Sequence, residues 1–209
     1  EDAAAIPALR KLQSSSSLSF SLDVDRALPA LSLAQVGPPY GTKEYGEVVW
    51  RRPRHLMRLL GSNCTVLYVD VDTVWISDPF VEISARPARD LTLVQDRPDR
   101  GKSDWTYFCS CFLYMQPTKE TRQLIWLWSK SVHGNKNQHI FNQVLRALHG
   151  AVQFEVLPLD RFPPGVVADE HPQAAVFHAN WINGHDNKVS FMRERGLWEE
   201  REAPSGLDF

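Results

Sequence analysis

The sequence predicts one α/β domain, built on a mixed and mostly parallel sheet that helices flank. Three observations carry this prediction. Short apolar runs rich in β-branched and aromatic residues recur along the chain, and the clearest spans residues 65–75; such runs are typical of buried strands in parallel sheets. Segments with apolar residues at helical spacing alternate with these runs. The 209 residues, 43% apolar and 23% charged, have an ordinary globular composition.

The expected elements follow from these periodicities and from the residues that begin or end each segment. Strands are expected at residues 18–22, 65–69, 91–95, 107–115, 152–157 and 174–177. After the strand at 65–69 the apolar stretch continues to residue 76 and is expected to end in a turn at 77–79. Helices are expected at residues 26–33, at 44–60 with a new start near Pro53, between the Thr118 N-cap and Gly134, at 138–148, and briefly at 191–195. We expect a mobile loop at 97–104 and an otherwise irregular stretch from residue 179 onward. An Ala-rich and then Ser-rich helical segment, residues 1–17, is expected to precede a domain that spans residues 18–209.

Charge and cysteine content narrow the classes of partner. A net charge of −2 does not indicate a nucleic-acid-binding surface, although it is compatible with local basic clusters, and we expect no nucleic-acid partner. No stretch is long and apolar enough to span a membrane, so membrane association is expected only through a segment absent from this chain. Three cysteines make no disulfide framework, and Cys109 and Cys111 are expected to be poorly placed to bridge if they lie in one strand. Asn63-Cys64-Thr65 is an N-glycosylation sequon, meaningful in a secretory lumen.

The strand expected at residues 65–69 ends in two carboxylates, Asp70 and Asp72. Unpaired charge at the edge of a core is unfavourable, and ligands bind at the carboxyl ends of strands in α/β sheets, so this pair indicates a site. Residues i and i+2 of a strand point to one side, which lets both side chains face one divalent cation. The competing interpretation is a turn pair that caps backbone amides; Asp23-Val24-Asp25 has the same triplet after a weaker strand.

Two further strand ends carry polar side chains, Asp96 and His178. Two carboxylates and one imidazole suit Mn²⁺, or Mg²⁺ with less help from the imidazole. His178 also opens a stretch in which Gly184 lets the backbone approach a phosphate and Lys188 supplies positive charge. His185 lies in the same stretch and competes with His178 for the role of ligand.

These motifs resemble those of a known family. Residues 67–75 with Asp78-Pro79-Phe80 are similar to the metal motif of nucleotide-diphospho-sugar transferases. The similarity is greatest to the group that contains plant rhamnogalacturonan xylosyltransferases and related arabinosyl- and galactosyltransferases. It extends over about residues 40–198 through Arg52-Pro53, Cys111-Phe112-Leu113-Tyr114, Asn137-Gln138 with Phe141-Asn142, Phe162-Pro163-Pro164-Gly165 and residues 178–188.

The resemblance implies a GT-A fold, a divalent ion (Mn²⁺ or Mg²⁺), a nucleotide-sugar donor that is most often a UDP-sugar, and a glycan or glycoprotein acceptor. It also implies transfer with retention at the anomeric carbon, and residence in the lumen of the Golgi and secretory pathway. The site residues that it implies are Asp70, Asp72 and His178 as metal ligands, Arg52, Asp70, Gly184 and Lys188 as donor contacts, and Gln138 and Asp96 as catalytic residues near the sugar.

Two features depart from the family pattern. Asn137 stands where related transferases commonly carry Asp before the Gln. GT-A folds also begin with a strand that cradles the nucleotide base. Only residues 18–22 offer such a strand before the helix expected at 44–60, so the first strand is expected to be altered or lacking.

Two alternatives to a transferase fit the same residues. Asp70, Asp72 and Val74 match the first motif of haloacid-dehalogenase-type phosphatases, in which Asp70 would be the nucleophile and Asp72 an acid/base. No later acidic pair of the form Gly-Asp-x-x-x-Asp follows to hold the metal of such an enzyme. The non-enzyme alternative is a catalytically degenerate transferase fold that binds a glycan or a partner.

Overall fold

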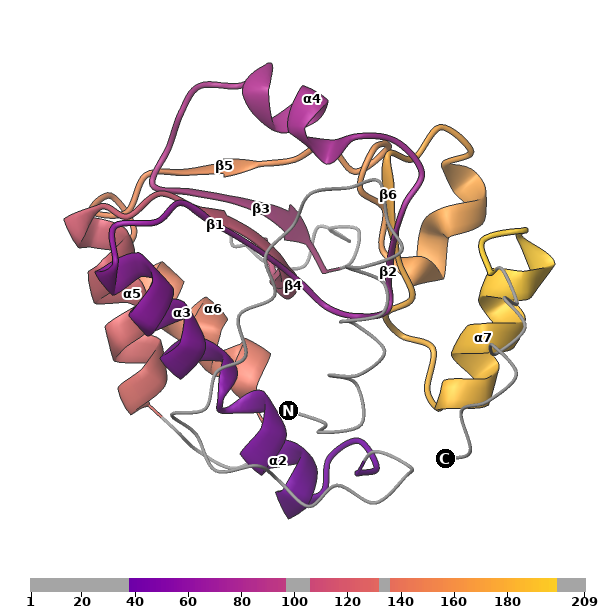
Figure 1. The fold of residues 1–209 in the computed structure, drawn as a ribbon, viewed down its shortest axis with the longest axis horizontal. Helices are drawn as coiled ribbons and strands as arrows, with labels where there is room; N and C mark the ends of the chain where they lie inside the picture. Colours follow the sequence, from indigo (N-terminus) through magenta and orange to yellow (C-terminus); the bar gives the residue numbers. More distant parts are fainter. Residues whose placement is uncertain (1–37, 97–105, 132–135, 199–209) are drawn as a thin grey trace, which may run out of the picture.

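A four-stranded sheet and a two-stranded ribbon form the centre of the structure, a computed structural model that describes residues 38–96, 106–131 and 136–198 (Figure 1). The sheet has the strand order β1-β4-β3-β5 and the ribbon pairs β2 with β6. The strands of the sheet are β1 (Val66–Val69), β4 (Phe108–Met115), β3 (Leu91–Gln95) and β5 (Phe154–Val156). The strands of the ribbon are β2 (Thr73–Trp75) and β6 (Val176–His178).

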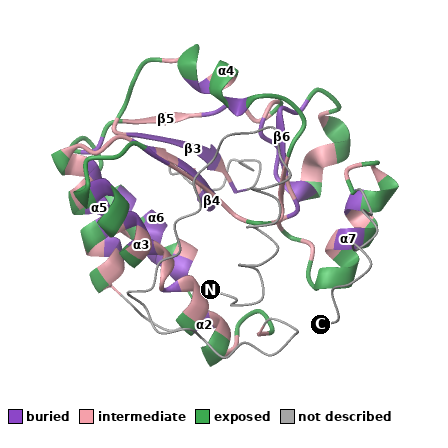
Figure 2. Cartoon of the chain, viewed as in Figure 1, coloured by how far each residue is buried: buried purple, intermediate pink, exposed green. Residues whose placement is uncertain are grey.

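Three helices cover one face of the four-stranded sheet: α3 (Arg52–Gly61), α5 (Lys119–Lys130) and α6 (Asn137–Ala147) (Figure 1). Their apolar stripes form the larger core, and Figure 2 shows the inward sides of these helices buried and their outer sides exposed. The side chains with the least exposure in this core include Leu60, Leu93, Leu113, Leu124, Trp128 and Phe141. The short helix α2 (Lys43–Val49) precedes α3.

A second core lies on the opposite face of the sheet, between β4, the ribbon and α4 (Pro79–Ser84). It joins Phe112 of β4 to Ile83 of α4 and to Val176 of β6. The last helix, α7 (His185–Glu194), packs on the ribbon through Met192, and the 3₁₀-helix η1 (Gly165–Glu170) lies beside β6. The ribbon is therefore held between the sheet and α7.

Strand β4 contains an irregularity that shapes the site. Leu93 of β3 lies opposite Leu113, but the next residue, Val94, lies opposite Cys109, so residues 110–112 have no partner in β3. Cys111 and Phe112 are consecutive and yet both pack in the second core, as expected where a bulge breaks the alternation of side chains.

The expected mixed sheet flanked by helices is confirmed, and each strand expected after residue 64 has a counterpart. The direction of most strands differs from the expectation. Among the described ladders β3–β5 is parallel, whereas β1–β4, β3–β4 and β2–β6 are antiparallel. The reason is visible where β3 meets β4: the Asp96 N–H donates to the Tyr107 carbonyl at 3.0 Å, so the chain returns as a hairpin, whereas parallel strands need a crossover, usually a helix.

Two helices differ from the sequence expectations, one in its existence and one in its length. A turn was expected where helix α4 lies. The Asp78 side chain caps this helix by accepting from the Phe80 N–H, and Pro79 occupies its first turn. Both residues are recognised signals for the start of a helix. Helix α7 spans ten residues where a short helix in an irregular stretch was expected. Its two buried residues, Val189 and Met192, make too narrow a stripe to be read from the sequence.

Several expectations lie outside the described residues: the segment 1–17, the strand at 18–22, the helix at 26–33 and the loop at 97–104. The same holds for the triplet Asp23-Val24-Asp25 and for Gly134 as a helix end. None of the helices in the described ranges is long and apolar enough to cross a bilayer.

Candidate active site

The two carboxylates of the acidic motif lie where the chain passes from the sheet to the ribbon. Asp70 directly follows β1, and its N–H donates to the Cys111 carbonyl at 2.9 Å. Asp72 directly precedes β2, and its carbonyl accepts from the Ala179 N–H at 3.0 Å. Both backbones are thus fixed by strand pairing, while Val71 between them is fully exposed. The motif therefore forms a turn, at Val71 and Asp72, that joins the two sheets. Its carboxylates pair with side chains, as described below, which differs from the expected capping of backbone amides.

His178 meets these carboxylates because the register of the ribbon places it there. Thr73 lies opposite His178 in the β2–β6 ladder, so the residue before β2 and the end of β6 are neighbours. His178 Nε2 is 3.2 Å from Asp72 Oδ1 and 4.0 Å from Asp70 Oδ2. One ligand atom from each of the three residues lies within 4.8 Å of the others. Carboxylate and imidazole donors in this arrangement fit Mn²⁺. The competing His185 is exposed at the start of α7.

Lys188 completes the surroundings of Asp72. It lies one turn into α7, and its Nζ makes an ion pair with Asp72 Oδ2. Burial by itself would raise the pKa of Asp72, but hydrogen bonds and charge from His178 and Lys188 outweigh it and hold that pKa well below its ordinary value of 3.8. Asp72 is therefore ionised at any physiological pH, which a metal ligand requires.

Asp70 is oriented by a different set of partners. The Arg52 Nη2 donates to Asp70 Oδ1 at 2.9 Å, and the Tyr68 hydroxyl donates to the same oxygen at 2.6 Å. The Arg52 guanidinium also lies 4.7 Å from the centroid of the Tyr68 ring, a cation–π contact. Burial, the first cause, and the neighbouring Asp70 raise the pKa of Tyr68, so its hydroxyl stays a donor. The other oxygen of Asp70 is left facing His178.

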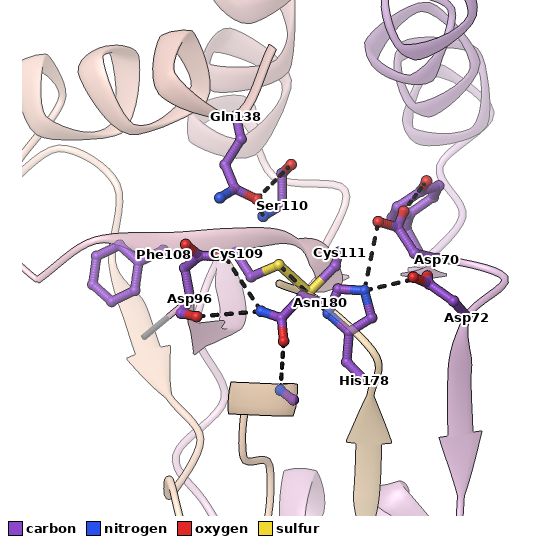
Figure 3. The surroundings of a disulfide bond; sticks show 12 residues. Asp70, Asp72, Asp96, Phe108, Cys109, Ser110, Cys111, Gln138, His178 and Asn180 are labelled. Carbon is purple, nitrogen blue, oxygen red and sulfur yellow. Dashed lines mark hydrogen bonds and ion pairs between the residues drawn. A yellow bond between two sulfur atoms is a disulfide. The ribbon is translucent and has the colours of Figure 1, made fainter. Parts of the chain in front are cut away.

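Arg52 links this carboxylate to the opposite wall of the site. Its Nη1 donates to the carbonyl of Ser110 at 2.9 Å and to the Ser110 hydroxyl at 2.7 Å. The Ser110 N–H in turn donates to Gln138 Oε1 at 3.0 Å (Figure 3). One guanidinium thus joins helix α3, the end of β1 and the bulge of β4, and through Ser110 it reaches helix α6.

Helix α6 docks on β4 through two amide side chains. Asn142 pairs with both backbone groups of Phe108, accepting from its N–H and donating to its carbonyl, each at 2.8 Å. Gln138, one helical turn earlier, accepts from Ser110, two residues further along the strand. The rise over four residues of a helix is similar to the rise over two residues of a strand. Gln138 and Asn142 can therefore contact Ser110 and Phe108 at the same time. In the structure, Gln138 and Asn142 of the 137–142 motif attach helix α6 to β4.

Asp96 is held at the end of β3 by residues that follow His178. The Asn180 side-chain amide donates to the Asp96 carbonyl at 3.2 Å and to its carboxylate at 3.4 Å, and the Trp181 indole donates to the same carbonyl at 3.0 Å. The Asn180 amide oxygen accepts from the Gly165 N–H at 2.5 Å. Asn180 therefore fixes the end of β3 and the start of η1 relative to β6 (Figure 3).

A cavity of about 570 Å³ lies over these groups, within the range of about 300–1,000 Å³ common for small-molecule sites. It brings together seven of the eight residues that the sequence indicated. They are Arg52, Asp70, Asp72, Asp96, Gln138, His178 and Lys188. The eighth, Gly184, has a φ of 89° as the N-cap of α7 and is joined to Asn183, which lines the cavity.

Three residues of the site were missed by the sequence analysis: Tyr68, Ser110 and Asn180. Tyr68 lies two residues from Asp70, and Asn180 two residues from His178, each along a strand or its extension. Ser110 directly precedes the resembling motif at residues 111–114. The period of two along a strand was the available signal for the first two. The role of Ser110 depends on the bulge, which no periodicity reveals.

Cys109 and Cys111 form a disulfide, which corrects the expectation that two cysteines of one strand are poorly placed to bridge. The bulge is the reason, because it brings their Cα atoms to 5.2 Å, within the range that a disulfide spans. Figure 3 shows the imidazole of His178 between this disulfide and the two carboxylates. The third cysteine, Cys64, is free and exposed.

Gly165 is required by close packing behind His178, and we expect Gly165→Ala to be destabilising. A Cβ at this position would lie 2.6 Å from the Asn180 carbonyl oxygen and 3.0 Å from that of His178, both of them backbone atoms. The free energy of unfolding, measured by urea denaturation, should fall by about 1–3 kcal/mol. Gly61→Ala is the matched control, since a Cβ there meets nothing within 4 Å; equal losses in both variants would contradict the packing argument.

The chain is similar in sequence to known sugar transferases. The sequence profile described as nucleotide-diphospho-sugar transferase matches residues 11–192. Two similar proteins of Arabidopsis thaliana are named UDP-D-xylose:L-fucose alpha-1,3-D-xylosyltransferase MGP4 and UDP-D-xylose:L-fucose alpha-1,3-D-xylosyltransferase 1. The first is 29% identical over 85% of this chain and 58% of its own length, and the second 28% over 76% and 52%. The chain thus spans little more than half the length of these curated relatives.

Proposed function

The chain belongs to the nucleotide-diphospho-sugar transferase family, and from this premise we propose that it transfers a pentose from a UDP-sugar to a hydroxyl group of a glycan. The names of its relatives suggest UDP-xylose as the donor and L-fucose as the acceptor sugar. We propose that the acceptor is a fucose-bearing glycan, free or on a glycoprotein. The observation that carries the proposal is the meeting of Asp70, Asp72 and His178 in one cavity beside Lys188.

The donor set fits a divalent metal ion, Mn²⁺ before Mg²⁺, held by Asp70, Asp72 and His178. When bound, such an ion supplies the positive charge that a departing diphosphate needs. Arg52 and Tyr68 hold one oxygen of Asp70 and so orient the carboxylate, which limits the reorganisation that binding requires. Lys188 and the N-terminus of α7, which begins after Gly184, add further positive potential for the diphosphate.

The sugar is proposed to lie between the metal ligands and the wall formed by Gln138 and Asp96. Both residues line the cavity, and both are fixed by backbone contacts: Gln138 by Ser110, and Asp96 by Asn180. We propose retention at the anomeric carbon. The bond from that carbon to the UDP oxygen breaks, the bond to the acceptor oxygen forms on the same face, and the acceptor proton passes to the departing diphosphate oxygen.

The cavity mouth also provides aromatic surface for the uracil base. Tyr40 and Tyr45 line the cavity with their ring centroids 5.1 Å apart, and Tyr40 is largely exposed. A nucleobase can stack on such rings without base-specific hydrogen bonds. Residence in the Golgi and secretory lumen is part of the proposal; the exposed sequon at Asn63 and the disulfide of β4 support it.

The proposal is tested by incubating the purified chain with Mn²⁺ and a panel of UDP-sugars, with and without an L-fucoside acceptor. We expect UDP release that depends on Mn²⁺ and is fastest with UDP-xylose, together with an α-linked product by NMR. Absence of UDP binding at millimolar concentration would favour the degenerate glycan-binding alternative. Rapid hydrolysis of p-nitrophenyl phosphate that is lost in Asp70→Asn would favour the phosphatase.

A further inference from the structure

The tripeptide Cys109-Ser110-Cys111 presents two kinds of side chain to the site from opposite sides of β4. Ser110 faces Arg52 and Gln138, as described above. The two cysteines face the other way, toward His178, and Cys109 Sγ lies 3.9 Å from His178 Nδ1. Ligand atoms of Cys109, Cys111 and His178 all lie within 4.8 Å of one another. This second group of potential ligands shares His178 with the carboxylates.

We propose that reduction of the Cys109–Cys111 disulfide creates a second metal site, in which the two thiolates and Nδ1 of His178 bind Zn²⁺. Thiolate and imidazole donors favour Zn²⁺ over the hard ions that carboxylates select. In a tetrahedral zinc site a sulfur and a nitrogen ligand lie about 3.6 Å apart, close to the 3.9 Å observed between Cys109 and His178. The fourth position is open to the cavity, which both Cys109 and His178 line.

The chemical step balances with a dithiol as reductant. A thiolate of the reductant attacks one sulfur of the protein disulfide, and its second thiol then closes the reductant's own disulfide. Two electrons and two protons pass to Cys109 and Cys111. Binding of Zn²⁺ then releases these two thiol protons to solvent.

The fold is expected to survive this reduction. A disulfide stabilises a fold more when it closes a longer loop, and this one encloses Ser110 alone. Strand β4 is paired with β1 on one side and β3 on the other, and its side chains contribute to both cores. The cysteines are thus free to change chemistry while the backbone that carries them stays in place.

The shared imidazole makes the two sites compete. Binding of Zn²⁺ at Nδ1 requires the proton to be on Nε2, which faces Asp72 Oδ1 at 3.2 Å and would donate to it. This is the carboxylate–histidine–zinc arrangement seen in many zinc sites. A metal ion at Asp70 and Asp72 needs the lone pair of Nε2 and therefore the opposite tautomer. Zinc at the thiolates should consequently weaken Mn²⁺ binding at the carboxylates.

The test uses Co²⁺ as a spectroscopic substitute for zinc in the Cys64→Ser background, which removes the exposed thiol. The protein is reduced with a phosphine, which does not itself supply a thiol ligand, and Co²⁺ is then titrated. We expect a near-ultraviolet thiolate-to-cobalt charge-transfer band in the reduced protein, its loss on adding Zn²⁺, and its absence in the oxidised protein. Saturating Mn²⁺ should shift the Co²⁺ titration of this band to at least about tenfold higher concentration, because the two sites share His178.

Two results would overturn the inference: a reduced protein without the charge-transfer band, or a band of equal strength in the oxidised protein. Cys111→Ser should remove most of the band, and a variant that keeps it in full would exclude the paired thiolates. Should Cys111→Ser not fold, alkylation of the reduced Cys64→Ser protein gives the same answer. Zn²⁺ should protect both thiols from N-ethylmaleimide, and unprotected thiols would contradict the site. None of these readouts depends on transferase activity.

Discussion

Replacing Asp72 by Asn is expected to lower the Mn²⁺-dependent turnover of UDP-sugar by more than about 100-fold, which exceeds the 10–100-fold typical for losing an outer-shell partner of a metal ligand. The substitution keeps the size of the side chain and removes the charge on which two side chains converge. His178 Nε2 is 3.2 Å from one Asp72 oxygen, and Lys188 is paired with the other. The measurement is the initial rate of UDP release at saturating donor, with Mn²⁺ affinity determined separately by calorimetry.

Asp160→Asn is the matched control for Asp72→Asn. Asp160 is exposed and lies in the turn after β5, away from the cavity lining. Its substitution should leave both the rate and the Mn²⁺ affinity unchanged. Full Mn²⁺-dependent activity in Asp72→Asn would show that the metal ligands are assigned wrongly. Circular dichroism melting of both variants separates a loss of chemistry from a loss of fold.

Replacing Arg52 by Ala is expected to reduce the free energy of unfolding by about 2–4 kcal/mol. The guanidinium is largely buried and makes three hydrogen bonds, one to Asp70 and two to Ser110. Its removal leaves a partly buried carboxylate without its charged partner. Arg52→Lys should recover part of this loss, because an ammonium keeps the charge but cannot span Asp70 and Ser110 as the planar fork does. Urea denaturation measures all three proteins.

The exposed Arg54 on the same helix supplies the control for Arg52. Arg54→Ala should change the free energy of unfolding by no more than about 0.5 kcal/mol. A double-mutant cycle of Arg52→Ala with Asp70→Asn then isolates the pair, and we expect a coupling of about 1–3 kcal/mol. Additive effects of the two substitutions would mean that Arg52 stabilises the fold without orienting Asp70.

The part of the site that could be predicted from sequence lies at the ends of strands. Asp70, Asp96 and His178 stand at the ends of short apolar runs and Asp72 directly precedes the next strand; these runs lie within two or three residues of their expected bounds. That these four ends meet in one cavity with Arg52, Gln138 and Lys188 was indicated by the order of motifs in a known family. The periodicity of apolar residues alone predicts helices and strands, but it does not predict which of them are neighbours in space.

What could not be predicted depends on tertiary geometry. The direction of β4 is set by its hairpin connection to β3, and the disulfide is set by a bulge that brings Cys109 and Cys111 together. Ser110 has its role because two elements far away in the chain, α3 and α6, both reach the bulge. None of these features leaves a pattern of apolar and polar residues, which is why single-sequence reasoning missed them.

The pairing of β2 with β6 has a consequence for protein engineering. Side chains in a strand alternate between two faces, so adding or deleting one residue within β2 or β6 would turn the imidazole of His178 away from Asp72. The chain between these strands includes α4, most of the main sheet, α5 and α6. Because it is long, a change in its length need not alter which residues of β2 and β6 pair. Insertion scanning should therefore find sharp intolerance at six positions, residues 73–75 and 176–178, and much greater tolerance in exposed turns such as that around Asp160.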